Sequence, residues 1–116
     1  MKVEDLDVFK LAHELTIEIY SITEMFPENE RYGLTSQMRR AAMSIGSNLM
    51  EGSHRFSKKE YRYFIGISRG STGELKYQLL LSRDLSYISI DMFEKVNSHC
   101  ERVSMMLSKL YSALDT

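Results

Sequence analysis

The sequence of 116 residues predicts an all-α protein with a single domain, folded as an antiparallel up-down-up-down four-helix bundle. Apolar residues recur at alternating steps of three and four along four segments, which is the spacing of amphipathic helices. One proline and a few polar turns separate these segments, so the connections are short and favour antiparallel neighbours. We expect the domain to cover residues 1–116, with helices at residues 5–25, 32–52, 58–85 and 90–114.

Local turn and capping signals set these boundaries. Pro27 lies in the FPENERYG break between the first two helices. Gly52 has the place of a C′ glycine and is expected to close the second helix. The S-K-K-E run at residues 57–60 is a capping box, which predicts the start of the third helix. Ser89 or Asp91 can cap the fourth.

Each predicted helix has a row of residues expected to face the core. In the fourth helix the row comprises Phe93, Val96, Cys100, Val103, Leu107, Leu110 and Leu114. In the second it comprises Leu34, Met38, Ala41, Ile45, Leu49 and Gly52. In the third it comprises Tyr61, Phe64, Ser68, Ser71, Leu75, Leu79 and Ser82. The first helix has a broader row with Phe9, Ala12, Thr16, Ile19, Tyr20 and Phe26.

The third helix also has an unusual second face, opposite its core row. Three glycines inside one helix cost on the order of 1 kcal/mol each relative to alanine, and close approach of another backbone could compensate. The second helix likewise places small residues and methionines away from its core row, whereas the fourth is apolar on one side only. We therefore predict a homo-oligomer with an interface formed by Met43, Gly46, Met50, Tyr63, Gly66, Gly70, Gly73 and Tyr77. The alternative is an ordinary surface with chance methionines.

The charges are distributed unevenly, although the net charge is only −1. Residues 1–30 carry two lysines against eight acids, whereas residues 31–76 carry nine lysines and arginines against three acids. This asymmetry suggests an anionic partner, or attraction between the two segments. The acidic N-terminus lacks the features of a secretion signal, no apolar run is long enough to span a membrane, and one cysteine excludes an internal disulfide. We expect a soluble cytoplasmic protein.

Basic and aromatic residues gather in the stretch HRFSKKEYRYF, at residues 54–64. Part of this stretch continues along the third helix as a row of cations that could neutralise phosphates. The predicted phosphate contacts are Arg39, Arg40, Arg55, Lys58, Lys59, Arg62 and Arg69. Alternatively, the row is a solvated face that pairs partly with the acidic first helix, or a surface for another protein or subunit.

The motifs that could support catalysis or metal binding are incomplete. Glu51 and His54 have the E-x-x-H spacing of di-iron bundles, but a second such motif is absent. The glycine-rich run at residues 66–73 lacks the G-K-[ST] ending of a phosphate-binding loop. Glu74 could be a buried glutamate or a polar tie between helices or subunits. We expect no enzyme, no metal, no cofactor and no small-molecule substrate.

Three blocks of the chain carry a resemblance to a known family: FPENERYGLTSQMRRAAMSIGSNLMEG, SKKEYRYF and STGELKYQLLLSRDLSYI. They closely resemble the four-helix-bundle family encoded in intervening sequences of bacterial 23S rRNA genes, and the resemblance covers nearly the whole chain. It implies a ring-shaped homopentamer without known catalysis. A related branch serves as the accessory protein of diversity-generating retroelements, where a basic pentamer binds nucleic acid and a reverse transcriptase. We therefore expect binding of structured RNA or DNA, or alternatively a protein scaffold or accessory subunit.

Overall fold

Four long helices dominate the computed structural model, which describes residues 1–115. They are α1 (Asp7–Thr23), α2 (Leu34–Ser53), α3 (Lys58–Asp84) and α4 (Ile90–Ala113), with short 3-10 turns η1 (Val3–Asp5) and η2 (Glu28–Glu30), and no strand occurs within the described residues. The expected helix at 5–25 is therefore shorter at both ends, and the one expected at 32–52 begins and ends later.

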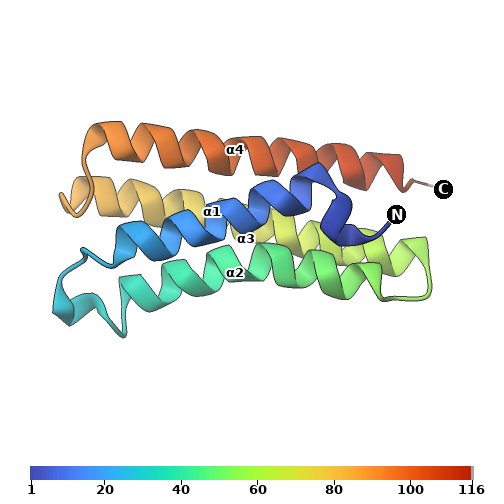
Figure 1. Cartoon of the computed structure of the whole chain (residues 1–116), viewed down its shortest axis with the longest axis horizontal. Coiled ribbons are helices and arrows are strands. Elements are labelled where there is room, and N and C mark those ends of the chain that lie inside the picture. Colours follow the sequence, from blue (N-terminus) through green and yellow to red (C-terminus); the bar gives the residue numbers. More distant parts are fainter. Residues whose placement is uncertain (116) are drawn as a thin grey trace.

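Consecutive helices pack side by side and run in opposite directions, as Figure 1 shows. α1 contacts α2 and α4, and α3 contacts the same two helices. In the described residues the backbones of α1 and α3 are not in contact, so these two helices lie diagonally opposite each other in the bundle. The N-terminus and the C-terminal end of α4 lie at the same end of the molecule as the α2–α3 turn (Figure 1). The predicted antiparallel four-helix bundle is confirmed.

Two serines act as the helix caps that the sequence predicts. Ser57 Oγ accepts a hydrogen bond of 3.1 Å from the backbone N–H of Glu60, and it donates to the Glu60 carboxylate at 3.2 Å. Ser89 Oγ accepts from the N–H of Met92 at 3.0 Å, so Ser89 and not Asp91 caps α4. Such caps satisfy backbone donors that have no partner inside the helix.

The core row of α1 agrees with the prediction in part. Ala12, Ile19 and Phe26 of the predicted row are buried, and Val8 and Leu15 are buried beside them, whereas Phe9 and Thr16 are half-buried and Tyr20 is exposed. Thr16 lies on the flank of α1 that faces α2, where its Oγ1 donates to the carbonyl of Ala42 at 3.1 Å. Because α1 packs between α2 and α4, its most buried row points between those two helices. Periodicity in one helix does not reveal where its neighbours lie.

Small polar residues allow α2 and α3 to pack closely. Ser68 is fully buried, and its Oγ donates to the carbonyl of Ile45 at 2.8 Å. The hydroxyl oxygens of Ser44 and Ser71 lie 2.9 Å apart, and Ser71 is only half-buried. In α3 the buried row contains Ile65, Ser68, Thr72, Leu75, Gln78, Leu79 and Ser82.

Gly52 does not end α2 as the sequence suggested. It lies inside the last turn with an ordinary negative φ, and α2 continues to Ser53. A Cβ atom at Gly52 would lie 2.8 Å from Phe64 Cβ and 3.3 Å from the carbonyl oxygen of Tyr61. The glycine is therefore required by the close approach of α3 and not by a left-handed backbone.

Candidate nucleic-acid interface

Three of the seven predicted phosphate contacts have partners within the fold, and Arg39 is the first. Its Nε donates to Thr23 Oγ1 at 2.9 Å, and one Nη lies 3.5 Å from the Glu24 carboxylate. The guanidinium also covers the ring of Tyr20, 4.6 Å from the ring centroid. Arg39 therefore joins α2 to the end of α1, and we assign it to the fold.

Arg55 and Arg62 are engaged in the same way. Arg55 pairs with Glu51 at 2.7 Å and lies over the Phe64 ring, 4.7 Å from its centroid. Arg62 donates through Nε to the carbonyl of Tyr111 at 3.1 Å and covers the Tyr111 ring at 3.9 Å. Stacked and hydrogen-bonded guanidinium groups of this kind are less available to a phosphate.

The other four cations are exposed, and each lacks an ion-pair partner among residues 1–115. They are Arg40 in α2 and Lys58, Lys59 and Arg69 in α3. Lys58 and Lys59 begin α3 and are the last two residues of the basic turn, a name we use for residues 54–59. These four side chains remain candidates for phosphate contacts.

Members of the basic row of α3 that lie further along the helix contact α4 and not the acidic first helix, which corrects that alternative. Lys76 lies 3.2 Å from the Glu101 carboxylate, and Arg83 covers the ring of Phe93 at 4.6 Å. α1 cannot supply partners because it lies diagonally across the bundle from α3.

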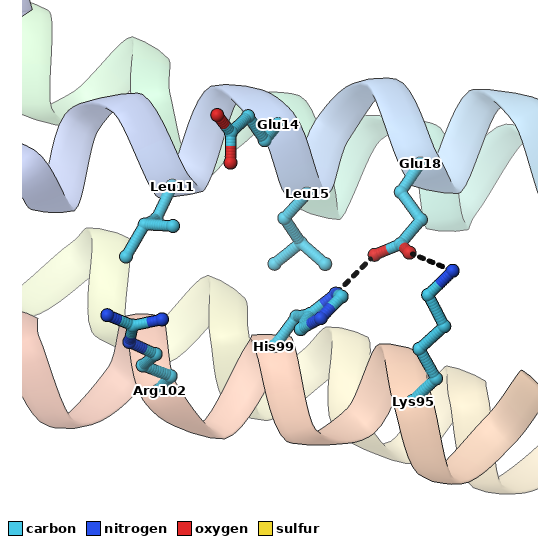
Figure 2. A pocket seen from close by; sticks show the side chains of 7 residues that line it. All are labelled: Leu11, Glu14, Leu15, Glu18, Lys95, His99 and Arg102. Atoms are coloured by element: carbon cyan, nitrogen blue, oxygen red, sulfur yellow. Dashed lines mark hydrogen bonds and ion pairs between the residues drawn. The ribbon is translucent and has the colours of Figure 1, made fainter.

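The acidic side chains of α1 reach the neighbouring helices instead. Figure 2 shows Glu18 between His99 and Lys95 of α4, with distances of 2.8 Å to His99 Nδ1 and 3.9 Å to Lys95 Nζ. A depression of about 400 Å³ opens beside this cluster, with Leu11, Leu15 and Arg102 in its lining. No local sequence signal indicates this cluster, because Glu18 and His99 are 81 residues apart.

The predicted oligomer interface falls on two separate surfaces. The first, which we call the glycine face, comprises Tyr63, Gly66, Gly70, Gly73 and Tyr77 on the outside of α3. A Cβ atom at any of these three glycines would meet no heavy atom within 4 Å. The two tyrosines are 65% and 63% exposed. The glycines therefore serve no packing purpose within the chain itself.

The second surface is a groove between α1 and α2 with a volume of about 690 Å³. Met43, Gly46 and Met50 line it from α2, and Phe9 lines it from α1, 3.8 Å from the position of a Cβ at Gly46. We call it the α1–α2 groove; its lining is Phe9, His13, Thr16, Met43, Gly46, Ser47, Met50, Glu51 and His54. Met43 and Met50 therefore lie on a different surface from the glycine face, whereas the sequence pattern predicts one interface for both.

The residues considered for catalysis are dispersed or bonded locally. Glu51 pairs with Arg55, and His54 Nδ1 lies 2.9 Å from the carbonyl oxygen of Met50. Glu74 is exposed, which excludes the buried glutamate that the sequence allowed. Within residues 1–115, no three histidine, cysteine or acidic side chains gather closely enough to hold a metal ion. None of the described helices is long and apolar enough to cross a membrane.

The fold and these surfaces define a small all-α bundle protein with a basic turn, a glycine face and an apolar groove. Residues 4–109 match the sequence model of the 23S rRNA-intervening sequence protein family, and the chain belongs to that family. Among solved structures, it is similar to a protein of unknown function from the S23 ribosomal protein family of Bacteroides thetaiotaomicron VPI-5482. The two share 21% identity with a TM-score of 0.81, over 90% of this chain and 97% of the other. That likeness concerns the fold, and no curated protein gives a significant match.

Proposed function

We propose that this protein is a non-enzymatic, cytoplasmic homo-oligomer that binds structured RNA or DNA through phosphate contacts. The observation that carries the proposal is the pair Lys58 and Lys59, adjacent, exposed and without an acidic partner in the described part of the chain. The nearest acids in sequence are already occupied, because Arg55 pairs with both Glu51 and Glu60. Positive charge at the basic turn is therefore left for an external anion.

Self-assembly would compensate for the low net charge of one chain. With a net charge of −1, a single copy would bind a polyanion weakly, whereas several linked copies present several basic turns to one nucleic acid. Two exposed surfaces, the glycine face and the α1–α2 groove, support assembly. Because they differ in shape and composition, one can bind the other on a neighbouring copy. Two different surfaces that meet head to tail generate a ring when the rotation closes. We propose a pentamer, as the family resemblance implies.

A salt series tests nucleic-acid binding. The affinity for the transcript of the intervening sequence should fall steeply with salt, and the variant K58A/K59A/R69A should show a shallower slope. Each lost phosphate contact reduces the slope of log K against log salt by about 0.7 to 0.9. The matched control K10A/R102A/K109A removes three exposed cations from α1 and α4. Equal losses in both triple variants would contradict a specific role for Lys58, Lys59 and Arg69.

The second candidate is a protein scaffold or accessory subunit without a direct nucleic-acid role. The observation in its favour is that Arg39, Arg55 and Arg62 are bonded within the chain. A scaffold predicts binding to RNA that is micromolar or weaker even at low salt, and nearly independent of salt. That result would overturn the first proposal.

A further inference from the structure

Phe56, in the basic turn between α2 and α3, has its ring completely in solvent. Phe56 is fully exposed, whereas the other four phenylalanines are buried or half-buried. A phenyl ring contributes to folding by leaving water, so at this position it contributes nothing to the core. The turn therefore joins two well-packed helices without using the ring.

The ring also has no stacking partner within residues 1–115. Arg55, its neighbour in sequence, turns away to Glu51 and to the ring of Phe64. The other highly exposed aromatic in a turn is Tyr32, 86% exposed, and Arg31 lies over that ring at 5.5 Å. Both faces of Phe56 are therefore open to a flat ligand, and Tyr32 is a natural control.

The surroundings of Phe56 are cationic. Lys58 and Lys59 follow two and three residues later, exposed and without ion-pair partners in the described chain. The Glu60 carboxylate accepts from Ser57 at 3.2 Å and lies 3.9 Å from Arg55, so it does not neutralise either lysine. An exposed aromatic ring and two exposed lysines without ion-pair partners thus lie within four consecutive residues of the described chain.

We infer that Phe56 stacks on an unpaired base while Lys58 and Lys59 contact the adjoining phosphates. Base–aromatic stacking beside positive charge is the usual mode of binding to single-stranded nucleic acid. Bases inside a duplex are already stacked and cannot receive the ring. The ligand class is therefore a loop or single-stranded segment of RNA or DNA. This inference rests on the proposed nucleic-acid function.

A protein partner fits this site less well. Protein interfaces require a contiguous apolar area, and their centres are depleted in lysine. Around Phe56 the turn offers only His54, Arg55, Ser57 and the two lysines. The apolar surfaces that suit a protein are the glycine face and the α1–α2 groove.

Phe56→Ala is the first test, with binding to an unstructured single-stranded RNA and to a blunt duplex of equal length. We expect the single-strand affinity to fall about five- to 160-fold, because a stacked base contributes about 1–3 kcal/mol. The duplex affinity should stay within about twofold, and the salt slope should not change, because the substitution removes no charge. Tyr32→Ala should bind both ligands as the native protein does.

Fluorescence supplies a direct reading of stacking, because the chain contains no tryptophan. Phe56→Trp introduces a single one, and its emission should be quenched on addition of single-stranded RNA but not of duplex. Tyr32→Trp is the matched control and should not respond.

If the native protein binds RNA but Phe56→Ala binds equally well, stacking is overturned and the proposed function stands. A change in assembly mass in Phe56→Ala would also overturn it, by assigning the ring to a protein contact. Absence of any nucleic-acid binding at low salt would overturn both proposals.

Discussion

Leu107 and Lys109 lie two residues apart on α4 and have opposite surroundings. Leu107 is fully buried in the core, whereas Lys109 is exposed. Leu107→Ala should lower the free energy of unfolding by about 2–5 kcal/mol, because it removes buried methyl groups and leaves a cavity. Lys109→Ala should change it by less than about 0.5 kcal/mol. Urea denaturation at a fixed protein concentration measures both, and equal losses would show that α4 presents a different face to the core.

The burial of Cys100 makes the stability of the folded protein depend on pH. Burial raises the pKa of its thiol to about 12 from an ordinary value of 9.0, and its Sγ lies 3.4 Å from the carbonyl oxygen of Thr72. The unfolded chain therefore loses this proton at a lower pH than the folded protein. The stabilisation is complete below about pH 9 and is lost as the pH rises towards 12, with a slope of up to about 1.4 kcal/mol per pH unit.

We accordingly expect the native protein to lose stability between about pH 9 and pH 10.5 more steeply than Cys100→Ala. Thermal unfolding followed by circular dichroism at several pH values gives the two slopes. The slopes are compared and not the absolute stabilities, because the alanine also leaves a small cavity. Burial of Tyr61 and the hydrogen bond from Tyr87 to Glu30 raise the pKa of both tyrosines, and these effects are common to both proteins. Parallel curves would contradict the prediction.

At the scale of a helix, α3 shows why glycine position matters more than glycine number. Gly70 lies on the glycine face with open space around it. Gly70→Leu should preserve helical circular dichroism, since leucine is a much better helix former and meets no neighbour within the chain. If the glycine face receives a second copy, the bulky side chain should block that approach. Analytical ultracentrifugation should then show smaller species than for the native protein.

Gly52 provides the contrasting case at the end of α2. Gly52→Ala should destabilise the fold by about 1–3 kcal/mol, because its Cβ would press on Phe64 and on the Tyr61 backbone of α3. The assembly state at fixed temperature should change little.

For Gly70→Leu, an assembly mass equal to that of the native protein would contradict the prediction and leave the three exposed glycines without an explanation.

For the whole molecule, the separation of the two apolar surfaces predicts how copies meet. In a head-to-tail contact, the α1–α2 groove of one copy receives the glycine face of the next. Met43→Glu, at a residue that is 47% exposed, should block the groove, and Gly70→Leu should block the glycine face. Each variant alone should remain monomeric. An equimolar mixture should form a dimer with one copy of each variant, because one intact groove and one intact glycine face remain.

Sedimentation of the two variants and their mixture distinguishes the arrangements. A two-fold contact between like surfaces would leave one of the variants dimeric by itself and would give no new species on mixing. The native protein should sediment as five times the 13.5 kDa of one chain. Any other closed number would contradict the pentamer while leaving the head-to-tail contact intact.

The sequence by itself determined the helices and their order. Alternating apolar spacing, the capping serines Ser57 and Ser89, and the short connections are local signals, and each depends on residues within a few positions of one another. It also located the exposed lysines of the basic turn and the glycines of α3. Such features need no knowledge of which helix lies opposite.

Only the tertiary structure decided which side chains of those helices are buried, which are paired and which are exposed. It added Val8 and Leu15 to the core row of α1 and left Tyr20 exposed. It also gave Arg39 and Arg62 partners within the fold and placed Met43 and Gly70 on different surfaces. It also showed that Phe56 faces solvent while Phe64 lies beneath Arg55. The physical reason is that burial and pairing depend on contacts between residues far apart in sequence. A helical pattern records the spacing within one segment but not the direction in which its neighbours lie.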